Sequence, residues 1–413
     1  MNYIVDIFNL YIDRLLKNKS SNQMKNQFEC LIKSYLWISI LAIHYSCSGD
    51  RVDKRTDKYY LEKESELKIN SLLSVELIDY YAKDRLFLGY TLISGGMEIV
   101  IVNERGDIVV SKNLVGEGPG QSMASLNSLS FSPVGNIWAL TNVEILEINK
   151  ELEIVYRKKY FPIVSTTLYN RAELLNYFFV DSILSAPYFI VNPESVPQYY
   201  KMDYGFYDSK LIEILPWGTD TTYQISPLSD RSISEYIDLS VSTLFGSVYA
   251  VGIKKNKIFL TGTLDNEITV YDPYSGKVVS RIGIDHEDFI NLSSKKLVRS
   301  DFPIYNEKVL LISKNHKIHL LDDQTLLLDY ITTVPSGLYE QKKISNPGYI
   351  YANDSYFHRF ILFKDGVQVI PELSPPLRGS LKLSMLGNRL LFRIDPVEEQ
   401  DFIQYEIYTI RKE

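Results

Sequence analysis

The feature that most constrains the fold is a β-hairpin pattern that recurs along most of the chain. From about residue 67 onward, apolar and polar residues alternate with period two, which is the period of β-strands and not of amphipathic helices. Pairs of these segments are separated by short clusters rich in Asn, Asp, Gly and Ser, which are typical of tight turns. Six such clusters occur, at residues 103–106, 149–151, 208–210, 272–276, 322–324 and 364–366. The chain therefore predicts an all-β fold built from repeated hairpins.

The spacing of these hairpins predicts a β-propeller. Most hairpins are preceded by one more strand, for example at residues 86–90, 137–140 and 258–261. The distance from turn to turn runs from the low forties to the sixties, which is typical of propellers with four-stranded blades. Each blade buries its faces only against its neighbours, so the repeats must close into a ring. No linker rich in Pro, Gly and Ser divides the array, so we predict one propeller domain over residues 67–413.

The number of blades is less tightly constrained. The six hairpins are followed by one terminal strand at residues 405–410, which the strand at residues 72–78 could complete. Such a closure would join the two ends of the ring and remove exposed sheet edges. This count favours seven blades. Six blades is the alternative, because residues 181–224 are irregular and could contain an insertion.

One blade carries a motif that resembles a known group of proteins. Gly116, Gly118 and Gly120 form the pattern G-x-G-P-G, and strand-like segments follow it up to about residue 160. This stretch resembles the NHL and six-bladed TolB-like propellers, and it looks closest to a poorly characterised group of propeller lipoproteins of Bacteroidetes. In that group the glycine loop joins the outer strand of one blade to the inner strand of the next. The resemblance implies a fold and no particular chemistry.

Composition excludes several classes of protein. The chain has 413 residues, 45% of them hydrophobic, and aromatic β-formers are frequent, with 31 Tyr and 18 Phe. The net charge is −7 and no basic block occurs, which argues against nucleic acid as a partner. The chain contains no run of 18 apolar residues, so no membrane-spanning helix is predicted. With only two cysteines, the chain has neither a disulfide scaffold nor a thiolate zinc cluster.

The first 46 residues have the pattern of an export signal. Lys25 and Lys33 precede an uncharged apolar stretch at residues 34–46, and Cys47 follows it. A cysteine in this position resembles the lipobox of bacterial lipoproteins, in which the cysteine after the cleavage site is acylated. The resemblance implies lipidation of Cys47 and a protein held at the bacterial cell envelope by that anchor alone. His44 and Tyr45 depart from the usual lipobox residues.

We therefore predict a signal region at residues 1–46, a lipid-anchored tether at residues 47–66 and the propeller after it. Met24 is a candidate for the true start of translation, because more than thirty residues before the apolar stretch is atypical. Two alternatives stay open for this segment. It could be an ordinary cleaved signal, or it could be an uncleaved helix in which Cys47 is a plain cysteine.

The alternating direction of the strands predicts where a ligand would bind. In an antiparallel blade, the loops between blades and the loops from second to third strand emerge on the same rim. Asn and Asp are common in turns because of their conformational preferences. Each such residue on the rim therefore has a structural interpretation as well as a binding one. The residues that we predict on this rim are Gly116, Gly118, Gly120, Gln121, Asn142, Asp265, Asn266, Asn315, His316, Asn353, Asp354 and Tyr356.

Motifs for catalysis and for metal binding are weak or absent in the sequence. The glycine loop lacks the Lys-Ser/Thr of a phosphate-binding loop, and no Gly-x-Ser-x-Gly elbow occurs. His316 and His319 are three residues apart in a predicted strand, so they should point to opposite faces. No histidine zinc site and no cofactor are therefore predicted. A divalent metal held by carboxylates in the central channel is left open by the sequence.

Three functions are compatible with these observations. The first is a membrane-anchored propeller that binds or scaffolds a protein or glycan of the envelope through the predicted rim. The alternative is a propeller enzyme, of lyase, hydrolase or lactonase type, that uses carboxylates of the channel. The third is a structural part of a larger envelope assembly. The missing catalytic motifs rank the binding module first and make an enzyme the less favoured interpretation.

Overall fold

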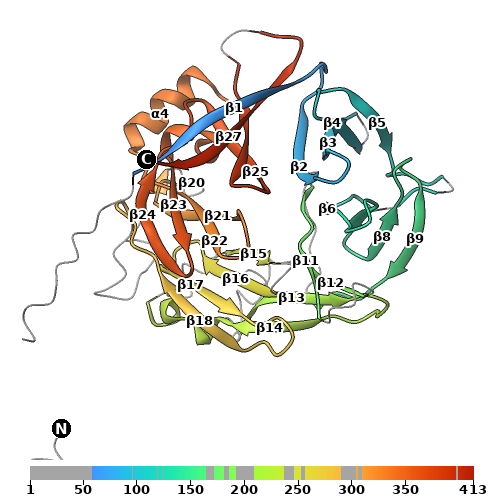
Figure 1. The fold of residues 1–413 in the computed structure, drawn as a ribbon, viewed down its shortest axis with the longest axis horizontal. Coiled ribbons are helices and arrows are strands. Elements are labelled where there is room, and N and C mark those ends of the chain that lie inside the picture. The colour runs from blue at the N-terminus through green and yellow to red at the C-terminus, as the bar shows by residue number, and fades with distance from the viewer. Residues whose placement is uncertain are drawn as a thin grey trace, which may run out of the picture. The chain divides into compact units, whose positions relative to one another are not determined.

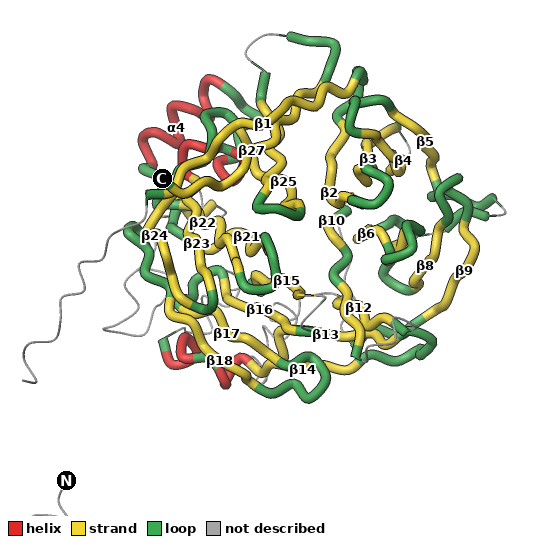
Figure 2. The backbone as a smooth tube through the Cα atoms, viewed as in Figure 1, coloured by secondary structure: helices red, strands yellow, loops and turns green. Residues whose placement is uncertain are grey.

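The computed structural model describes residues 58–94, 96–118, 120–122, 124–163, 172–180, 186–191, 209–236, 246–252, 256–289, 304–305, 309–396 and 399–413. These residues form six antiparallel sheets that stand as blades around a central axis (Figures 1 and 2). The prediction of an all-β propeller is confirmed. The preference for seven blades is wrong. No helix in the described part of the chain is long and apolar enough to cross a membrane.

The first four blades follow the chain from the inner strand to the outer strand. Blade one contains β2 (Val75–Tyr81), β3 (Leu86–Ile93), β4 (Gly96–Asn103) and β5 (Ile108–Asn113). Blade two contains β6 (Ser128–Phe131), β7 (Ile137–Leu140), β8 (Glu144–Ile148) and β9 (Ile154–Lys159). Blade three contains β11 (Tyr177–Phe179), β12 (Pro187–Val191), β13 (Lys210–Pro216) and β14 (Tyr223–Pro227). Blade four contains β15 (Ser247–Gly252), β16 (Lys257–Gly262), β17 (Glu267–Tyr271) and β18 (Val278–Gly283).

Short elements occupy the connections between these blades. Strand β10 (Glu173–Leu174) pairs in parallel with β6 and gives blade two a fifth strand on its channel side. The 3₁₀ helices η1 (Leu228–Asp230) and η2 (Ser232–Glu235) follow blade three. Strands β19 (Ile304–Tyr305) and β20 (Val309–Leu310) form a small separate sheet after blade four.

Blade five contains the longest insertion of the described chain. Its strands are β21 (Lys314–Leu320), β22 (Thr325–Ile331), β23 (His358–Lys364) and β24 (Val367–Leu373). Between β22 and β23 the chain forms helix α4 (Ser336–Ser345) and the 3₁₀ helices η5 (Tyr351–Asn353) and η6 (Ser355–Phe357). The insertion has its own small core, in which Tyr339, Tyr351 and Phe357 pack against Ile331.

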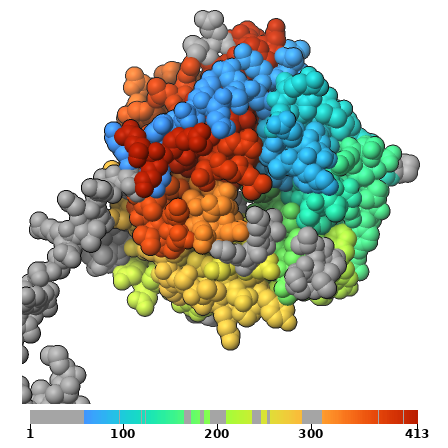
Figure 3. Space-filling view, in the orientation of Figure 1, coloured from blue at the N-terminus to red at the C-terminus, as the bar shows by residue number. Residues whose placement is uncertain are grey.

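Blade six joins the two ends of the described chain. It contains β25 (Gly379–Met385), β26 (Arg389–Ile394) and β27 (Ile403–Lys412), and its outer strand is β1 (Tyr59–Ile69). Strand β1 pairs with β27 along its length, from Tyr59 opposite Lys412 to Ile69 opposite Ile403. Figure 3 shows the same closure, with the first described residues in blue lying against the last residues in dark red.

The error in blade number has a specific cause. The sequence assigned the hairpins at residues 322–324 and 364–366 to two blades, whereas the first joins β21 to β22 and the second joins β23 to β24 of the same blade. The insertion at residues 332–357 separates the two hairpins along the chain, so that one blade has the length of two repeats. The second and third strands of this blade, β22 and β23, thus pair in space although they are far apart in sequence.

The predicted closing strand is also wrong. Residues 75–81 form the inner strand of blade one, and the strand that closes the ring is β1, whose first residues were assigned to the tether at 47–66. The sequence of β1 is charged because most of its side chains are exposed on both faces, as expected for an outermost strand. The propeller therefore begins by residue 59, before the predicted boundary at residue 67.

The hydrophobic core is divided among the interfaces between blades. Leu88 and Ile101 of blade one pack with Leu129 and Leu146 of blade two, and a similar buried cluster lies at each of the other five interfaces. Each blade thus depends on two neighbours, as in other repeat architectures. At one contact the closing strand approaches very closely, because a Cβ on Gly106 would lie 1.8 Å from the carbonyl oxygen of Lys68.

The antiparallel order of the strands defines two rims. We call insertion rim the side that bears the connections between blades and those from second to third strand. It includes residues 70–74, the η1–η2 segment, the α4 insertion, residues 374–378, residues 395–396 and residues 399–402. We call hairpin rim the opposite side, where short turns such as residues 82–85, 132–136 and 386–388 join adjacent strands.

We expect the contact between blades six and one to contribute measurably to stability. The buried Tyr405 hydroxyl of β27 donates to the Val75 carbonyl oxygen at 2.6 Å and accepts the Leu77 N–H at 3.2 Å. Tyr405→Phe leaves both backbone groups of β2 without this partner, so the free energy of unfolding should fall by about 2 kcal/mol. Urea unfolding measures the change. Tyr274→Phe, at a side chain that is 69% exposed, is the control. Equal stability of the two variants would contradict this role of Tyr405.

Candidate functional site

The α4 insertion of blade five is held together by the carboxylate of Asp354. Its Oδ2 accepts hydrogen bonds from the Tyr349 hydroxyl at 2.7 Å and from Lys342, and its Oδ1 accepts the Tyr356 N–H at 3.1 Å. Burial opposes ionisation of Asp354, but these donors outweigh it and hold the pKa of the carboxyl below its usual value. Asp354 therefore holds α4 and the following segments of the insertion together, and its predicted neighbours Asn353 and Tyr356 remain exposed.

Below this insertion, Asp329 and His358 form a buried pair. The Asp329 Oδ1 lies 2.8 Å from His358 Nδ1, and the Ala352 carbonyl oxygen lies 2.9 Å from His358 Nε2. An imidazole with an acceptor at each nitrogen carries both protons. Burial opposes that charge, but the carboxylate of Asp329 outweighs it and raises the pKa of His358. The charged pair ties β22 to the segment that leads into β23.

A bulge in β21 changes the positions of two histidines. The pairing of β21 with β22 shifts register between Asn315 and Lys317, so His316 is an extra residue in the strand. The expectation that His316 and His319 point away from each other relied on a regular strand. Both imidazoles in fact lie close enough to Asp329 to interact with its charge. His316 is exposed, whereas His319 is buried and burial lowers its pKa to about 3.

Ionic side chains also join the inner part of blade six to blade one. Glu76 of β2 pairs with Lys382 of β25 at 3.2 Å and with Arg393 of β26. In blade five, the ammonium of Lys314 lies 5.0 Å from the centroid of the Tyr351 ring. The inner strands β2 and β21 therefore have polar side chains at their ends on the insertion rim. The carboxylates of Glu76, Asp329 and Asp354 are each paired with a cation of the same domain.

Asp265 and Asn315 are brought together, but in a buried structural network. Asp265 pairs with Arg231 at 2.6 Å, and both side chains have no exposed surface. The amide nitrogen of Asn315 donates to the carbonyl oxygens of Asp265 at 2.7 Å and Gly262 at 2.8 Å, and its Oδ1 lies 2.9 Å from His286 Nε2. Neither side chain is available to a ligand in this arrangement.

Asn315 and His316 also differ in position from the prediction. The sequence placed them in a turn from second to third strand, whereas they lie in β21, the inner strand of blade five. Asn142 and Asn266 do lie in such turns, in blades two and four. Asp265 of blade four and Asn315 of blade five are joined by a hydrogen bond, but among the described residues no hydrogen bond or ion pair links them to Asn142 of blade two or to Asp354 of blade five. Cys47 lies outside the described residues.

The glycine loop is folded around the side chain of Gln121. The Gln121 Oε1 accepts the Gly118 N–H at 2.7 Å, and a Cβ on Gly116 or Gly118 would lie within 2.6 Å of that oxygen. Gly120 has a φ of +81°, which side chains disfavour. The loop joins β5 to β6, as expected for a connection between blades. Its glycines are thus explained by local geometry.

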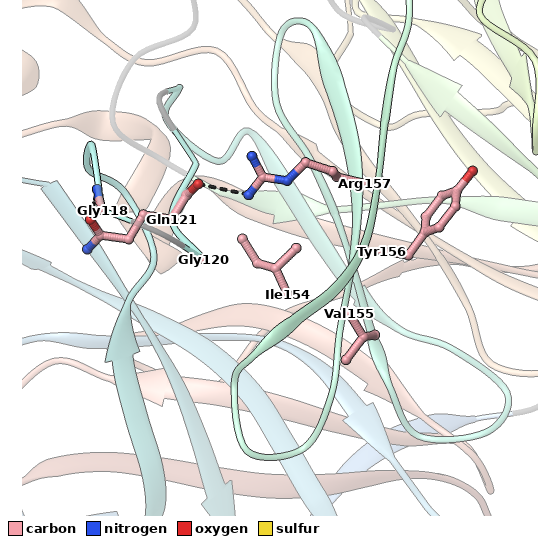
Figure 4. Close-up of a pocket in the computed structure, with 7 residues that line it drawn as sticks. All are labelled: Gly118, Gly120, Gln121, Ile154, Val155, Tyr156 and Arg157. Carbon is pink, nitrogen blue, oxygen red and sulfur yellow. Dashed lines mark hydrogen bonds between the residues drawn. The ribbon is translucent and has the colours of Figure 1, made fainter.

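A shallow cavity of about 380 Å³ lies between this loop and the outer strand β9 of blade two. It is lined by Gly118, Gly120, Gln121 and residues 154–157 (Figure 4). The guanidinium of Arg157 donates to the Gln121 carbonyl oxygen at 2.8 Å and closes one end of the cavity, while Tyr156 points away from the loop. The sequence identified the loop, but it did not identify Arg157 as its neighbour.

Several residues of these networks were missed by sequence reasoning. Arg231 lies in the irregular segment after blade three, and the partner of His358, Asp329, is 29 residues away along the chain. Lys342 of α4 belongs to an element that was not predicted. Among the described residues, no group of three or more His, Cys, Asp or Glu side chains has a geometry that could hold a metal ion.

Glu372 of β24 lies in an acidic environment at the interface of blades four and five. Its Oε1 accepts the Glu287 N–H at 3.3 Å, and Arg359 is 3.8 Å away. Burial, together with the charges of Glu287 and Asp288, raises the pKa of Glu372 to about 7. This carboxyl is therefore partly protonated near neutral pH.

Two solved structures resemble the propeller. One is a member of the DUF4221 family from Bacteroides vulgatus, with a TM-score of 0.60 and 12% identity over 87% of this chain and 100% of that chain. The other is a putative exported protein from Bacteroides fragilis, with a TM-score of 0.50 and 11% identity over 86% of this chain and 95% of that chain.

The likeness extends to the fold alone. It confirms the resemblance to propellers of Bacteroidetes at the level of architecture. No protein-family model matches the sequence, and the search of curated proteins found no match.

The buried pair of Arg231 and Asp265 generates a stability prediction. Arg231→Met leaves a carboxylate without its cation in a fully buried place, which should lower the free energy of unfolding by about 3–5 kcal/mol. The double variant Arg231→Met/Asp265→Leu should be less destabilised than the single variant, because no charge then stays buried. Arg105→Met breaks an exposed pair with Asp107 and serves as the control in the same denaturation experiment. A double variant no more stable than the single one would contradict this explanation.

Glu372 generates a prediction about pH. Its pKa in the folded protein is about 7, above the value of 4.5 for a free Glu, so the folded state binds more protons between these values. This carboxyl therefore makes the protein less stable as pH rises from 5 to 8. As pH rises over that interval, the free energy of unfolding of Glu372→Gln should increase relative to that of the wild type. Denaturation curves at pH 5, 6.5 and 8 measure this difference. Glu340→Gln, at an exposed position of α4, should show no such trend. Parallel pH curves for the wild type and Glu372→Gln would disprove the assignment.

Proposed function

We propose that the protein is an exported β-propeller, anchored at the cell envelope through Cys47, that binds a protein or glycan partner through its insertion rim. The observation that carries the proposal is the difference between the two rims. Among the described residues, the hairpin rim bears short turns, whereas the insertion rim carries α4, η5, η6, η1 and η2. A fold that needs only short turns for stability has no structural requirement for these additions, and loops of this kind commonly carry function.

Exposed apolar side chains lie on the hairpin rim, at Val134, Tyr274 and Leu386, and also on the insertion rim. Leu72, Leu377, Ile344 and Tyr356 have exposed fractions of 88%, 84%, 77% and 60%, and all four lie on its connections in blades one, five and six. Single exposed apolar residues are common, but several on neighbouring connections favour a surface that is covered by a partner. A cationic side chain lies beside one of them, because the Lys342 ammonium is 5.5 Å from the centroid of the Tyr356 ring.

The place where the described chain ends is compatible with an anchor. Lys58 pairs with Glu413 at 3.2 Å. In blade six these two ends lie on the hairpin rim, at the position where other blades have a turn from the third to the fourth strand. Residues 48–58 could span at most about 40 Å if fully extended. An acylated Cys47 would then hold the propeller near the membrane and leave the insertion rim accessible. One structure with the same fold is described as a putative exported protein.

A binding function is favoured over the alternative of a propeller enzyme. Glu76, Asp329 and Asp354 lie near the inner end of the insertion rim, where a catalytic carboxylate would be expected, and each is paired with a cation. Strand β10 also covers the channel side of blade two. These contacts give the carboxylates a structural role. They therefore favour partner binding by the surrounding surface over catalysis by the carboxylates.

The anchor is tested by metabolic labelling with a palmitate analogue in a bacterial host that processes lipoproteins. Cys47→Ala should lose the label and move from the membrane fraction to the soluble periplasmic fraction. Cys30→Ala is the matched control, because it removes the other cysteine of the chain and should keep the label. Labelling of the Cys47→Ala variant would exclude this anchor and would leave the rim proposal to its own test.

The rim is tested by photocrosslinking in cells. The photoreactive residue p-benzoylphenylalanine is placed at Tyr356 or Leu377 of the insertion rim, and at Val134 or Leu386 of the hairpin rim as matched exposed controls. We expect a discrete crosslinked product from the first pair, identified by mass spectrometry, and none from the second. Crosslinking from the hairpin rim alone would reverse the assignment. Products that contain only this chain would show self-association instead.

A further inference from the structure

The outer strand of blade two has an edge that is open to strand addition. Strand β9 is outermost in its sheet, so it pairs with β8 on one side only. Along such an edge, the N–H and C=O groups of alternate residues point away from the sheet. A free edge of this kind can pair with an extended peptide from another protein. The other outer strands share this property, so the argument depends on what lies beside β9.

Beside β9 lies the cavity of about 380 Å³ whose opposite wall is the glycine loop. Gly118 and Gly120 present no side chains, and a Cβ on Gly120 would meet no atom within 4 Å. A peptide backbone could therefore approach the loop closely. The loop is already held in shape by the hydrogen bonds of Gln121 with Gly118 and with Arg157, at 2.7 and 2.8 Å. Both walls of the groove are thus formed before a ligand arrives (Figure 4).

The side chains of β9 indicate the charge of the occupant. The strand ends in the run Arg157, Lys158 and Lys159, in a chain whose net charge is −7. Arg157 and Lys159 are exposed, and so is Val155 with 56% of its surface. A β-bulge makes Val155 an extra residue of β9, so the regular alternation holds only from Tyr156 onward. Arg157 and Lys159 then share one face and present two cationic side chains to a neighbouring strand. A second copy of β9 would place like charges together, which disfavours self-pairing.

We propose that the groove between β9 and the glycine loop binds an extended acidic peptide segment of a partner protein, which adds as a further strand to the free edge of β9. Backbone hydrogen bonds to β9 would supply the part of the affinity that does not depend on the sequence of the segment. Carboxylates of the segment would pair with Arg157 and Lys159. The glycine loop is itself a connection of the insertion rim, but the groove does not include the four exposed apolar residues of that rim, so a partner bound there could reach it with a tail.

The probe is a fluorescein-labelled hexapeptide of alternating Glu and Thr, and binding to the propeller is measured by fluorescence anisotropy at low salt. We expect saturable binding that weakens as salt is added, because the contacts are partly ionic. A peptide of the same sequence with N-methyl groups on alternate backbone nitrogens tests the strand pairing directly. It keeps every carboxylate but loses backbone donors, so it should bind at least about tenfold more weakly. Equal binding of the methylated peptide would overturn strand addition.

Protein variants locate the site. Arg157→Glu should weaken binding of the acidic peptide by about tenfold or more and should improve binding of the matching Lys-Thr peptide. Lys112→Glu is the matched control, because it reverses an exposed charge on β5, the outer strand of blade one. The two variants should melt at similar temperatures, which shows that a loss of binding is not a loss of fold. No binding by the wild type, or equal weakening by both variants, would refute the proposal.

Discussion

The structure depends on the burial of apolar surface between blades, and this burial is complete only when the ring closes. Every described interface has its own buried cluster, including the one between blades six and one. An open array would leave two blade faces in water, at the cost of the hydrophobic free energy of both. Pairing of β1 with β27 prevents this, because the start of the chain becomes part of its last blade.

The connections of the insertion rim are stabilised in a different way. They do not belong to the repeat, so they cannot use the packing that one blade offers the next. Instead, buried polar groups attach them to the blades: Arg231 attaches the η1–η2 segment through Asp265, and His358 of β23 attaches the α4 insertion through the Ala352 carbonyl oxygen. Such pairs contribute little net stability when compared with apolar packing, but they hold one geometry because an unpaired buried charge is costly. This division separates the part of the molecule that forms the ring from the part that can vary with function.

The successes and failures of the sequence analysis follow from the range of the interactions concerned. The turns at residues 103–106, 149–151 and 272–276 were identified correctly, because turn chemistry involves only neighbouring residues. The assignment of the glycine loop as a connection between blades was correct for the same reason. The position of His316 was misjudged, because one extra residue in β21 reverses the expected alternation and nothing in the local pattern marks it. The partners of Asp265 and Asp354 could not be named, since Arg231 and Lys342 lie in segments without periodicity.

The sequence by itself determined that this chain forms antiparallel hairpins of one repeating size, and that they must assemble into a closed ring. These properties depend on side-chain alternation and turn residues over a few positions. The tertiary structure decided the number of blades, the strand that completes the last one, and which polar residues are buried. The physical reason is that these features depend on contacts between distant residues, such as the hydrogen bond from Tyr405 to Val75 across 330 positions. A charged strand such as β1 and a solvated tether look alike until the partner strand is known.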